Sequence, residues 1–542
     1  MPLGPFDSRA KRSRCSACST SHLKCSGDVP CSHCARRHIA CTYTSQNKTN
    51  KLILVERGKQ KTQINWSLKL SRPSTSTLPS PSTATATVTV SHINHYVPPP
   101  RRLNDKSTIY ITFFDTFSKR NDFTGRSRTA GDEVKQLAEL HSRKGNHLLN
   151  AMLAIGAMYA GKLNANDGPP KRESLLIAFQ HYSYAVDGLK EAIGAWRLGA
   201  TQQPQRRKQD QHVCILWTTF FLGLFELMND VTGHWWLQHI VHGTSVALKA
   251  SGPESCRSGP GLAFFIQARM FEVSRTILFN EPTFLTEPEW VALSRDMWSE
   301  EVNFESGVAR NSWRPVDSLL DIMVMCSNLR VRAATFIAAQ EISPSQIPGP
   351  EARAIAEDGH RLREALRSWS TAYIPETGQL SSFRLVDSPG LNDGRHQEGG
   401  GHQGLSDPSS LMARVFFAAI SIYLSGIFDY ELLHWQRLNI AVAILDQATI
   451  VQHLHTILAL TELGLDRTTL SPLVFLFPLR IAGSRSRYQW QRDQVVAMVE
   501  RVGQAFAVAS AIKLDLMYVW KMRRVVEAEG FASNDTLSAP DT

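Results

Sequence analysis

Six cysteines near the start of the chain have a spacing suited to binding metal. They form two copies of the pattern Cys-x2-Cys-x6-Cys, and each cysteine of the second copy follows its counterpart by 16 residues. A thiolate is a soft ligand, and two cysteines separated by two residues can reach one tetrahedral metal from a single turn. Six thiolates complete two four-coordinate zinc sites when two of the sulfurs bridge both metals, and the repeat predicts that the bridging cysteines are equivalent. The cysteines are Cys15, Cys18, Cys25, Cys31, Cys34 and Cys41.

With Lys24 before the third cysteine and Pro30 between the two halves, this motif resembles the fungal zinc binuclear cluster DNA-binding domain over residues 15–41. The resemblance implies that the chain binds two zinc ions and that Cys15 and Cys31 bridge them. Each zinc is then held by the three cysteines of one half and the bridging cysteine of the other. The resemblance also implies a short helix after each Cys-x2-Cys pair. In the first half this helix is residues 19–24, and its C-terminal end enters the major groove, commonly at CGG triplets.

Two other arrangements of the same cysteines remain open at this point. An ordinary four-cysteine zinc site would use the two Cys-x2-Cys pairs, and a disulfide framework would use no metal. The four-cysteine site leaves Cys25 and Cys41 without a role, although they occupy matching positions in the repeat. In the binuclear arrangement sulfur fills every coordination position, so the zinc would be structural and would activate no water.

The residues expected to contact DNA differ from what is usual in that family. Its members carry several Lys or Arg residues between the second and third cysteines, whereas this chain has Ser21, His22 and the single cation Lys24. Because Lys can donate to guanine O6 and N7, we expect Lys24 and His22 to contact base edges, although His22 can equally be a solvent-exposed helix residue. Phosphate contacts are expected from Arg14, Arg36 and Arg37.

The positive charge of the chain is concentrated around the cysteines. Residues 1–72 contain fourteen Lys and Arg against three acidic residues, a net charge of +11, while the whole chain carries +10. Such a segment is expected in a protein that binds a polyanion, because neutralised phosphates release counterions. A short basic cluster ahead of the cysteines is a candidate nuclear import signal, so we expect a nuclear protein. It consists of Arg9, Lys11, Arg12 and Arg14.

Neither secretion nor membrane insertion is expected. The N-terminus lacks a signal-peptide core, and the longest charge-free apolar run, residues 415–428, is too short to span a bilayer. Cys214, Cys256 and Cys326 are scattered and predict no disulfide framework, consistent with a reducing nuclear or cytosolic compartment.

The sequence predicts five parts. A basic arm (1–14) precedes the zinc module (15–41), a linker (42–104), an all-α regulatory domain (105–530) and a frayed tail (531–542). The linker is basic and then rich in Ser, Thr and Pro, with Ser or Thr at 12 of the 21 positions from 71 to 91, and is predicted to be disordered. It contains no sustained heptad pattern, so a homodimer stays open without support from a coiled coil.

Helical periodicity dominates after residue 105. One predicted helical face consists of Leu175, Phe179, Tyr182, Val186, Leu189 and Ile193. Similar patterns predict helices at 148–159, 213–228, 235–248, 320–338, 352–369, 415–428, 440–460 and 495–526. We expect one large all-α domain that can divide into two lobes, with a mobile polar loop at 381–410 between them.

This half of the chain resembles the fungal-specific transcription factor domain of the second type. The resemblance rests on an aromatic segment at 113–117, on the run 148–155 with Tyr159, and on His181, Tyr182, Ala185 and Leu189 in the next helix. It implies a regulatory role, in which the domain receives a signal, contacts the transcription machinery and shapes activation.

The favoured function is a sequence-specific transcription factor that binds double-stranded DNA and regulates RNA polymerase II genes. Because the Ser-rich helix 19–24 is similar to that of regulators of secondary-metabolite gene clusters, we expect an activator of such a cluster. The alternative is a zinc-containing protein–protein adaptor without sequence-specific DNA binding.

An enzyme is not expected, because the sequence contains none of the common metalloprotease, hydrolase, phosphate-binding or dinucleotide-binding motifs. His239 and His242 lie one helical turn apart but have no adjacent carboxylate or cysteine, and His453 and His455 diverge on a helix. Residues 287–305 mix acidic and aromatic residues as activation segments do, although an amphipathic surface helix is favoured.

Overall fold

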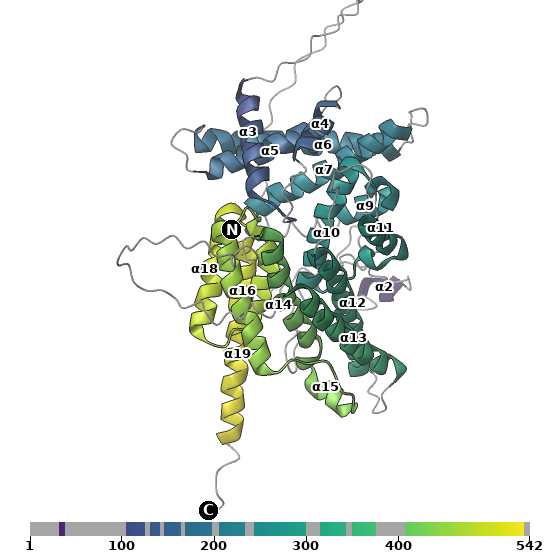
Figure 1. The fold of residues 1–542 in the computed structure, drawn as a ribbon, viewed down its shortest axis with the longest axis vertical. Coiled ribbons are helices and arrows are strands. Elements are labelled where there is room, and N and C mark those ends of the chain that lie inside the picture. Colours follow the sequence, from purple (N-terminus) through teal and green to yellow (C-terminus); the bar gives the residue numbers. More distant parts are fainter. Residues whose placement is uncertain are drawn as a thin grey trace, which may run out of the picture. The chain divides into compact units, whose positions relative to one another are not determined.

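The computed structural model describes residues 32–37, 105–124, 131–140, 146–163, 169–197, 205–232, 243–299, 315–342, 349–374 and 407–535. The chain divides into two units, Met1–Pro81 and Ser82–Thr542. The described part of the first unit is the helix α2 (Ser32–Arg37). The described part of the second unit is helical, and its extended pairing is limited to one isolated bridge (Figure 1).

The N-terminal helices of the second unit pack around α5 (His147–Lys162), which is buried from Ala151 to Gly161. Small side chains allow this close packing. A Cβ on Gly156 would lie 2.0 Å from the carbonyl oxygen of Tyr110, so glycine is required where the two helices cross. The neighbours of α5 are α3 (Asp105–Arg120), α4 (Gly131–Leu140), α6 (Lys171–Arg197) and α7 (Gln205–Asn229).

The fully buried line of α6 lies one position away from the apolar face predicted for it, although Leu175, Tyr182, Val186 and Leu189 of that face still pack against the core. Its buried positions include Ser174, Ala178 and Ala185, whereas Phe179 is 44% exposed. The cause is the close contact with α5, which admits small side chains along the contact line and displaces the larger ones to its flanks.

The middle of the chain forms a second group of helices, which lie on one side of the unit (Figure 1). Helix α12 contacts both α10 and α13, and the ring of Phe428 lies against Gly359 of α13. The elements are α9 (Ser245–Ser251), η2 (Pro253–Cys256), α10 (Gly259–Phe279), η3 (Phe284–Thr286), α11 (Pro288–Ser299), α12 (Pro315–Ile342) and α13 (Pro350–Tyr373).

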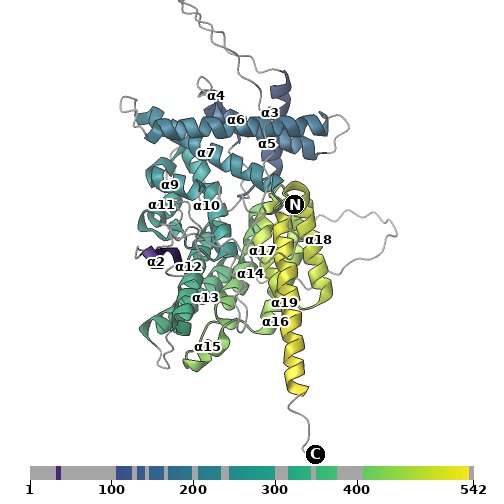
Figure 2. The ribbon, with the colours of Figure 1, turned by 180° about the vertical axis from the view of Figure 1, so that it is seen from behind.

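The C-terminal helices form a bundle around α14 (Pro408–Asp429) and α17 (Leu476–Arg485), seen from both sides in Figures 1 and 2. Sixteen residues of α14 are buried, which explains the long apolar run predicted there. The remaining elements are α15 (Leu432–Arg437), α16 (Gln447–Arg467), η6 (Pro472–Phe475), α18 (Gln489–Ala505) and α19 (Ala509–Asp535).

The two lobes that the sequence allowed within the regulatory domain are not separate compact units of the structure. The second unit is continuous from Ser82 to Thr542, and hydrogen bonds join segments that are far apart in its sequence. The amide of Asp122 donates to the carbonyl of Thr469 (2.9 Å), and the amide of Ser471 donates to the carbonyl of Asp122 (2.7 Å). This bridge fastens the end of α3 to the loop after α16. Sequence patterning detects helices but carries no signal for such long-range pairing.

Several predicted boundaries also change. Residues 440–446 are irregular, and α16 begins only after Asp446, whose side chain accepts a hydrogen bond from the amide of Thr449 (2.9 Å). Asp407 caps α14 in the same way, so residues 407–410 belong to the start of a helix and not to the predicted loop. The predicted helix 495–526 is interrupted between α18 and α19, and α19 continues through Asp535 into the predicted tail.

Within the described residues, three helices are long and apolar enough to cross a membrane by length and composition: Asp210–Asn229, Pro315–Gln340 and Pro408–Asp429. The length of α14 was therefore underestimated from the charge-free run 415–428, because the helix extends beyond that run at both ends. Within these windows 89%, 44% and 83% of the residues are buried inside the protein. Burial in the protein core accounts for the apolar composition of the first and third.

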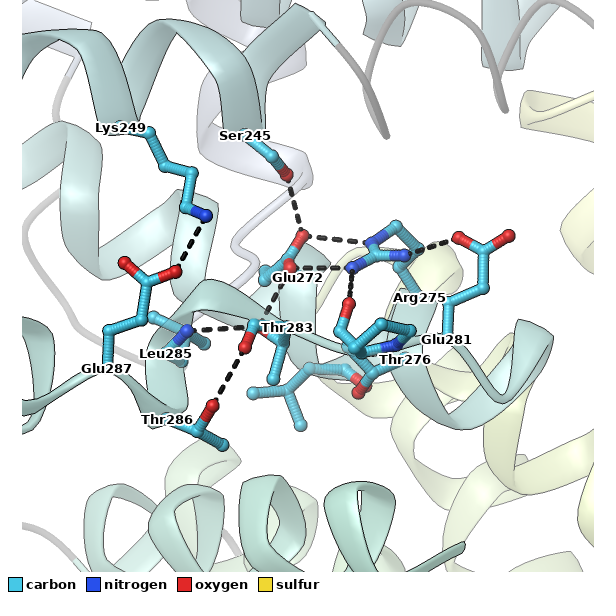
Figure 3. Close-up of polar contacts among 12 residues, drawn as sticks. Ser245, Lys249, Glu272, Arg275, Thr276, Glu281, Thr283, Leu285, Thr286 and Glu287 are labelled. Carbon is cyan, nitrogen blue, oxygen red and sulfur yellow. Dashed lines mark hydrogen bonds and ion pairs between the residues drawn. The ribbon is translucent and has the colours of Figure 1, made fainter. Parts of the chain in front are cut away.

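A buried ion pair joins α9, α10 and η3 (Figure 3). Glu272 and Arg275 have side chains 6% and 7% exposed, and Arg275 Nη2 donates to Glu272 Oε1 over 2.7 Å. Glu272 also accepts hydrogen bonds from Ser245 and Thr283, while Arg275 also pairs with Glu281 (2.8 Å). Arg275 makes four hydrogen bonds and Glu272 accepts four, and these bonds offset the removal of the two charges from water.

Candidate metal centre and nucleic-acid interface

The described part of the cysteine repeat is α2, which starts directly after Cys31 and has the sequence SHCARR. The Cys34 side chain is fully buried, whereas Arg36 and Arg37 are exposed in the last helical turn. One face of this helix therefore buries a cysteine sulfur, and another presents two guanidinium groups to solvent. A zinc ligand must be buried beside the metal, whereas side chains that contact phosphates must be exposed, and α2 meets both requirements.

The helix begins earlier than the resemblance implied. It starts at Ser32, between the two cysteines of the pair, whereas a helix after Cys34 was expected. Arg36 and Arg37 lie in the last turn of the helix, where their positive charges interact favourably with the negative end of the helix dipole. A six-residue helix is nonetheless too short to be stable alone. The buried sulfur of Cys34 fits the role of a zinc ligand, and metal coordination would supply the missing stability.

The other predicted site residues lie outside the described residues. They are Cys15, Cys18, Cys25, Cys31 and Cys41 among the metal ligands, Arg14, His22 and Lys24 among the DNA contacts, and Arg9, Lys11 and Arg12 in the import cluster. The pair His239 and His242 also lies outside them.

The scattered cysteines of the regulatory domain are buried thiols and not a reactive site. Burial raises the pKa of Cys214 to about 12 and that of Cys256 to about 11, and it raises the pKa of Cys326 further. These thiols therefore stay protonated near neutral pH and are poor nucleophiles and ligands. Among the residues in the described ranges, no group of three or more His, Cys, Asp or Glu side chains could hold a metal.

The two histidines of α16 diverge as predicted. His453 packs against Phe417, with ring centroids 5.6 Å apart, whereas the exposed His455 lies beside Trp490. Neither arrangement resembles a catalytic or metal site.

The acidic and aromatic stretch that begins at Glu287 is helical over Pro288–Ser299. Trp290 is fully buried and packs against Phe265 and Phe284. A partner could not reach this aromatic side chain without unfolding the helix, so the favoured prediction of an ordinary amphipathic helix is correct for these residues.

Comparison with known families separates the alternatives left by the sequence. Residues 14–50 match the fungal Zn(2)-Cys(6) binuclear cluster domain, and residues 132–530 match the fungal specific transcription factor domain. The first match contains all six cysteines, and a cluster of this kind binds two zinc ions. The predicted fold class and the two-zinc cofactor are therefore confirmed. Both matched families are transcription factor domains.

Individual relatives share shorter segments. The chain is 32% identical to an uncharacterized protein of Emericella nidulans over 147 residues. The aligned segment covers 27% of this chain and 28% of that protein. It is 36% identical to Glucose starvation modulator protein 1 of Meyerozyma guilliermondii over 81 residues. This aligned segment covers 14% of this chain and 16% of that protein. No solved structure matches the chain.

Since the regulatory-domain match alone spans most of the chain and follows a complete six-cysteine cluster, this protein belongs to the family of fungal DNA-binding transcription factors with a Zn(2)-Cys(6) cluster and a fungal specific transcription factor domain.

Proposed function

We propose that this protein acts in the nucleus as a sequence-specific activator of RNA polymerase II genes. The observation that carries the proposal is the geometry of α2, where Cys34 is buried while Arg36 and Arg37 are exposed. A metal-held helix that presents two guanidinium groups is suited to phosphate contact, because Arg can pair with phosphate oxygens through two parallel hydrogen bonds.

In the proposed cluster all six cysteines are ligands, and Cys15 and Cys31 bridge the two zinc ions. Lys24 and His22 contact base edges, Arg14, Arg36 and Arg37 contact phosphates, and CGG-like triplets are the target. The family match to residues 14–50 supports these assignments. The import cluster of Arg9, Lys11, Arg12 and Arg14 directs the chain to the nucleus.

The test of DNA binding is a titration of the full chain with target and random duplexes at several salt concentrations. We expect affinity to fall steeply with salt, because each neutralised phosphate releases counterions. Changing Arg36 and Arg37 together to Ala should weaken binding to all duplexes similarly and reduce the salt slope by about 2. The matched control changes Arg361 and Arg367, two exposed arginines of α13, to Ala and should leave both quantities unchanged.

The competing function, a zinc-containing protein adaptor, predicts a different result. An adaptor would contain zinc but show no preference for any duplex over random DNA. Lys24→Ala separates the two further, since loss of a base contact should reduce the ratio of target to random affinity. Unchanged specificity in Lys24→Ala would exclude our assignment of base reading to residues 19–24.

For the regulated genes we propose a secondary-metabolite cluster, on the basis of the Ser-rich segment 19–24. The name of the Meyerozyma relative offers another possibility, a response to glucose starvation. A genome-wide map of bound sites, with transcript levels after deletion of the gene, decides between them. It also gives the half-site spacing, which reports whether a homodimer binds.

A further inference from the structure

Arg330, on α12, is a buried cation whose charge the described residues do not balance. Its side chain belongs to a residue that is 6% exposed, and within the described ranges its guanidinium group has neither a hydrogen-bond acceptor nor an ion-pair partner. The buried arginines Arg269 and Arg275, by contrast, each pair with a carboxylate. A buried charge without a partner is strongly unfavourable, so Arg330 is the one of these three that calls for an added anion.

The groups around Arg330 have a positive net charge. Burial raises the pKa of Tyr423 on α14, while Arg330 and Arg480 act in the opposite direction, so both guanidinium groups lie close enough to the Tyr423 hydroxyl to interact with it. Arg480 Nε donates to Asp515 Oδ2 over 2.9 Å. Tyr423 is neutral because of its raised pKa. The two arginines and the single carboxylate therefore leave a net charge of +1.

Uncharged polar groups lie around the same hydroxyl. Tyr423 donates to Asn280 Oδ1 (2.9 Å), which leaves the amide nitrogen of Asn280 to donate to another molecule. Ser327, one turn before Arg330 on α12, also interacts with Tyr423. These residues come from α10, α12 and α14, which together with α17 contact one another in this part of the domain (Figure 2). The unpaired guanidinium group thus lies at a junction of four helices.

We propose that Arg330 binds a small monocarboxylate at this junction. A guanidinium group pairs with a carboxylate through two parallel hydrogen bonds. A monoanion balances the net charge of +1, whereas a phosphate dianion would bury an uncompensated negative charge. No nitrogen of Arg330 is among the fully enclosed, unpartnered polar atoms in the described part of the chain, so solvent reaches the guanidinium group. The low exposure of the residue restricts the ligand to a small ion.

Binding at this position would link two parts of the regulatory domain. Arg330 lies in the middle group of helices, and Tyr423 and Arg480 lie in the C-terminal bundle. A carboxylate that neutralises Arg330 removes the unfavourable charge between them and stabilises the folded domain by mass action. The domain would then respond to a small organic acid through a site separate from the zinc cluster.

The test measures binding of radiolabelled acetate to the full chain by equilibrium dialysis, together with thermal unfolding. We expect one saturable site with a Kd on the order of millimolar and a melting temperature that rises as the site fills. Chloride should compete about tenfold more weakly, because a spherical ion does not match the two parallel N–H groups of the guanidinium. Absence of saturable acetate binding, or equal competition by chloride, would overturn the proposal.

Arg330→Met locates the site, because it removes the charge and keeps an unbranched side chain. It should abolish acetate binding, and without acetate its melting temperature should equal or exceed that of the unaltered protein. The matched control is Arg332→Met, two positions away on α12, since Arg332 already pairs with Glu351 and Asp358. This control should bind acetate normally. If both variants bind acetate equally, the anion binds elsewhere and the proposal fails.

Arg330→Lys decides the question if Arg330→Met does not fold. Lysine keeps the positive charge but cannot form two parallel hydrogen bonds, so acetate should bind about tenfold more weakly. Unchanged affinity would contradict the proposed pairing. DNA binding should be the same in all of these variants, so a failure here leaves the proposed function of the zinc cluster intact.

Discussion

The zinc module and the regulatory domain differ in what stabilises them. The described element of the module is a six-residue helix with one buried cysteine, so metal coordination must supply its folding free energy, on the order of 10 kcal/mol. The regulatory domain instead buries large aromatic side chains, among them Trp217, Trp290 and Trp435, and its described residues offer no metal site. A single chain thus holds one part together by coordination and the other by hydrophobic burial. The two parts should therefore respond independently to chelators, pH and core substitutions.

Loss of a bridging ligand is the largest expected effect. In the proposed cluster Cys31 bridges both zinc ions, so Cys31→Ala should abolish DNA binding and reduce bound zinc from two ions to fewer than one per chain. The regulatory domain should keep its helical circular dichroism and its melting temperature. Cys326→Ala, a buried thiol outside the cluster, is the control and should leave zinc content unchanged. If Cys31→Ala also lowered the helix content or the melting temperature of the regulatory domain, the two parts would not be stabilised independently.

Breaking the buried ion pair should produce the opposite pattern. Glu272→Gln removes one of the two carboxylates that pair with Arg275 and leaves Glu281, so it should lower the free energy of unfolding of the regulatory domain by about 1–3 kcal/mol. Zinc content should not change. The control Glu364→Gln breaks an exposed pair with Arg367 and should cost less than about 0.5 kcal/mol. Urea unfolding followed by circular dichroism measures both.

Two glycines on neighbouring helices test the close packing of the core. Gly156→Ala would place a methyl group 2.0 Å from the Tyr110 carbonyl and should destabilise the domain by about 1–3 kcal/mol. Gly194→Ala, on α6, meets no atom within 4 Å and should stabilise the domain by up to about 1 kcal/mol, because alanine favours the helix. Thermal unfolding of both variants would show shifts of opposite sign. Shifts of the same sign would mean that the approach of α3 to α5 does not constrain Gly156.

The smallest effect concerns pH. Burial lowers the pKa of His453 to about 4, below its usual value of 6.5. Between these values the unfolded chain binds the proton and the folded chain does not, so stability falls as the pH falls from about 6.5 to about 4. His453→Phe should reduce the stability lost between pH 7 and pH 5 by roughly 1–2 kcal/mol, an amount that allows for partial exposure of the ring. His455→Phe, at an exposed position on the same helix, is the matched control.

Much of the helical architecture was predictable because helices depend on local spacing. The described apolar patterns overlap helices, but residues 440–446 are irregular, the pattern 495–526 is divided between two helices, and a capping residue such as Asp407 or Asp446 determined where a helix starts. The orientation of α6 was not predictable, since its buried face depends on how closely α5 approaches. Glu272 and Arg275 lie three residues apart on one helix, a spacing that occurs on many exposed helices and gives no sign of burial.

The sequence by itself determined the metal and the class of partner, because ligand number, ligand type and local charge are properties of a short segment. Twenty-seven consecutive residues, 15–41, contain the whole zinc-binding pattern. The tertiary structure alone decided which distant groups meet. Asn121 and Ser471 are 350 residues apart and share a hydrogen bond, and Glu272 accepts hydrogen bonds from Ser245 and Thr283, which lie outside its own helix. Such contacts follow from the packing of whole helices, and no local pattern encodes them.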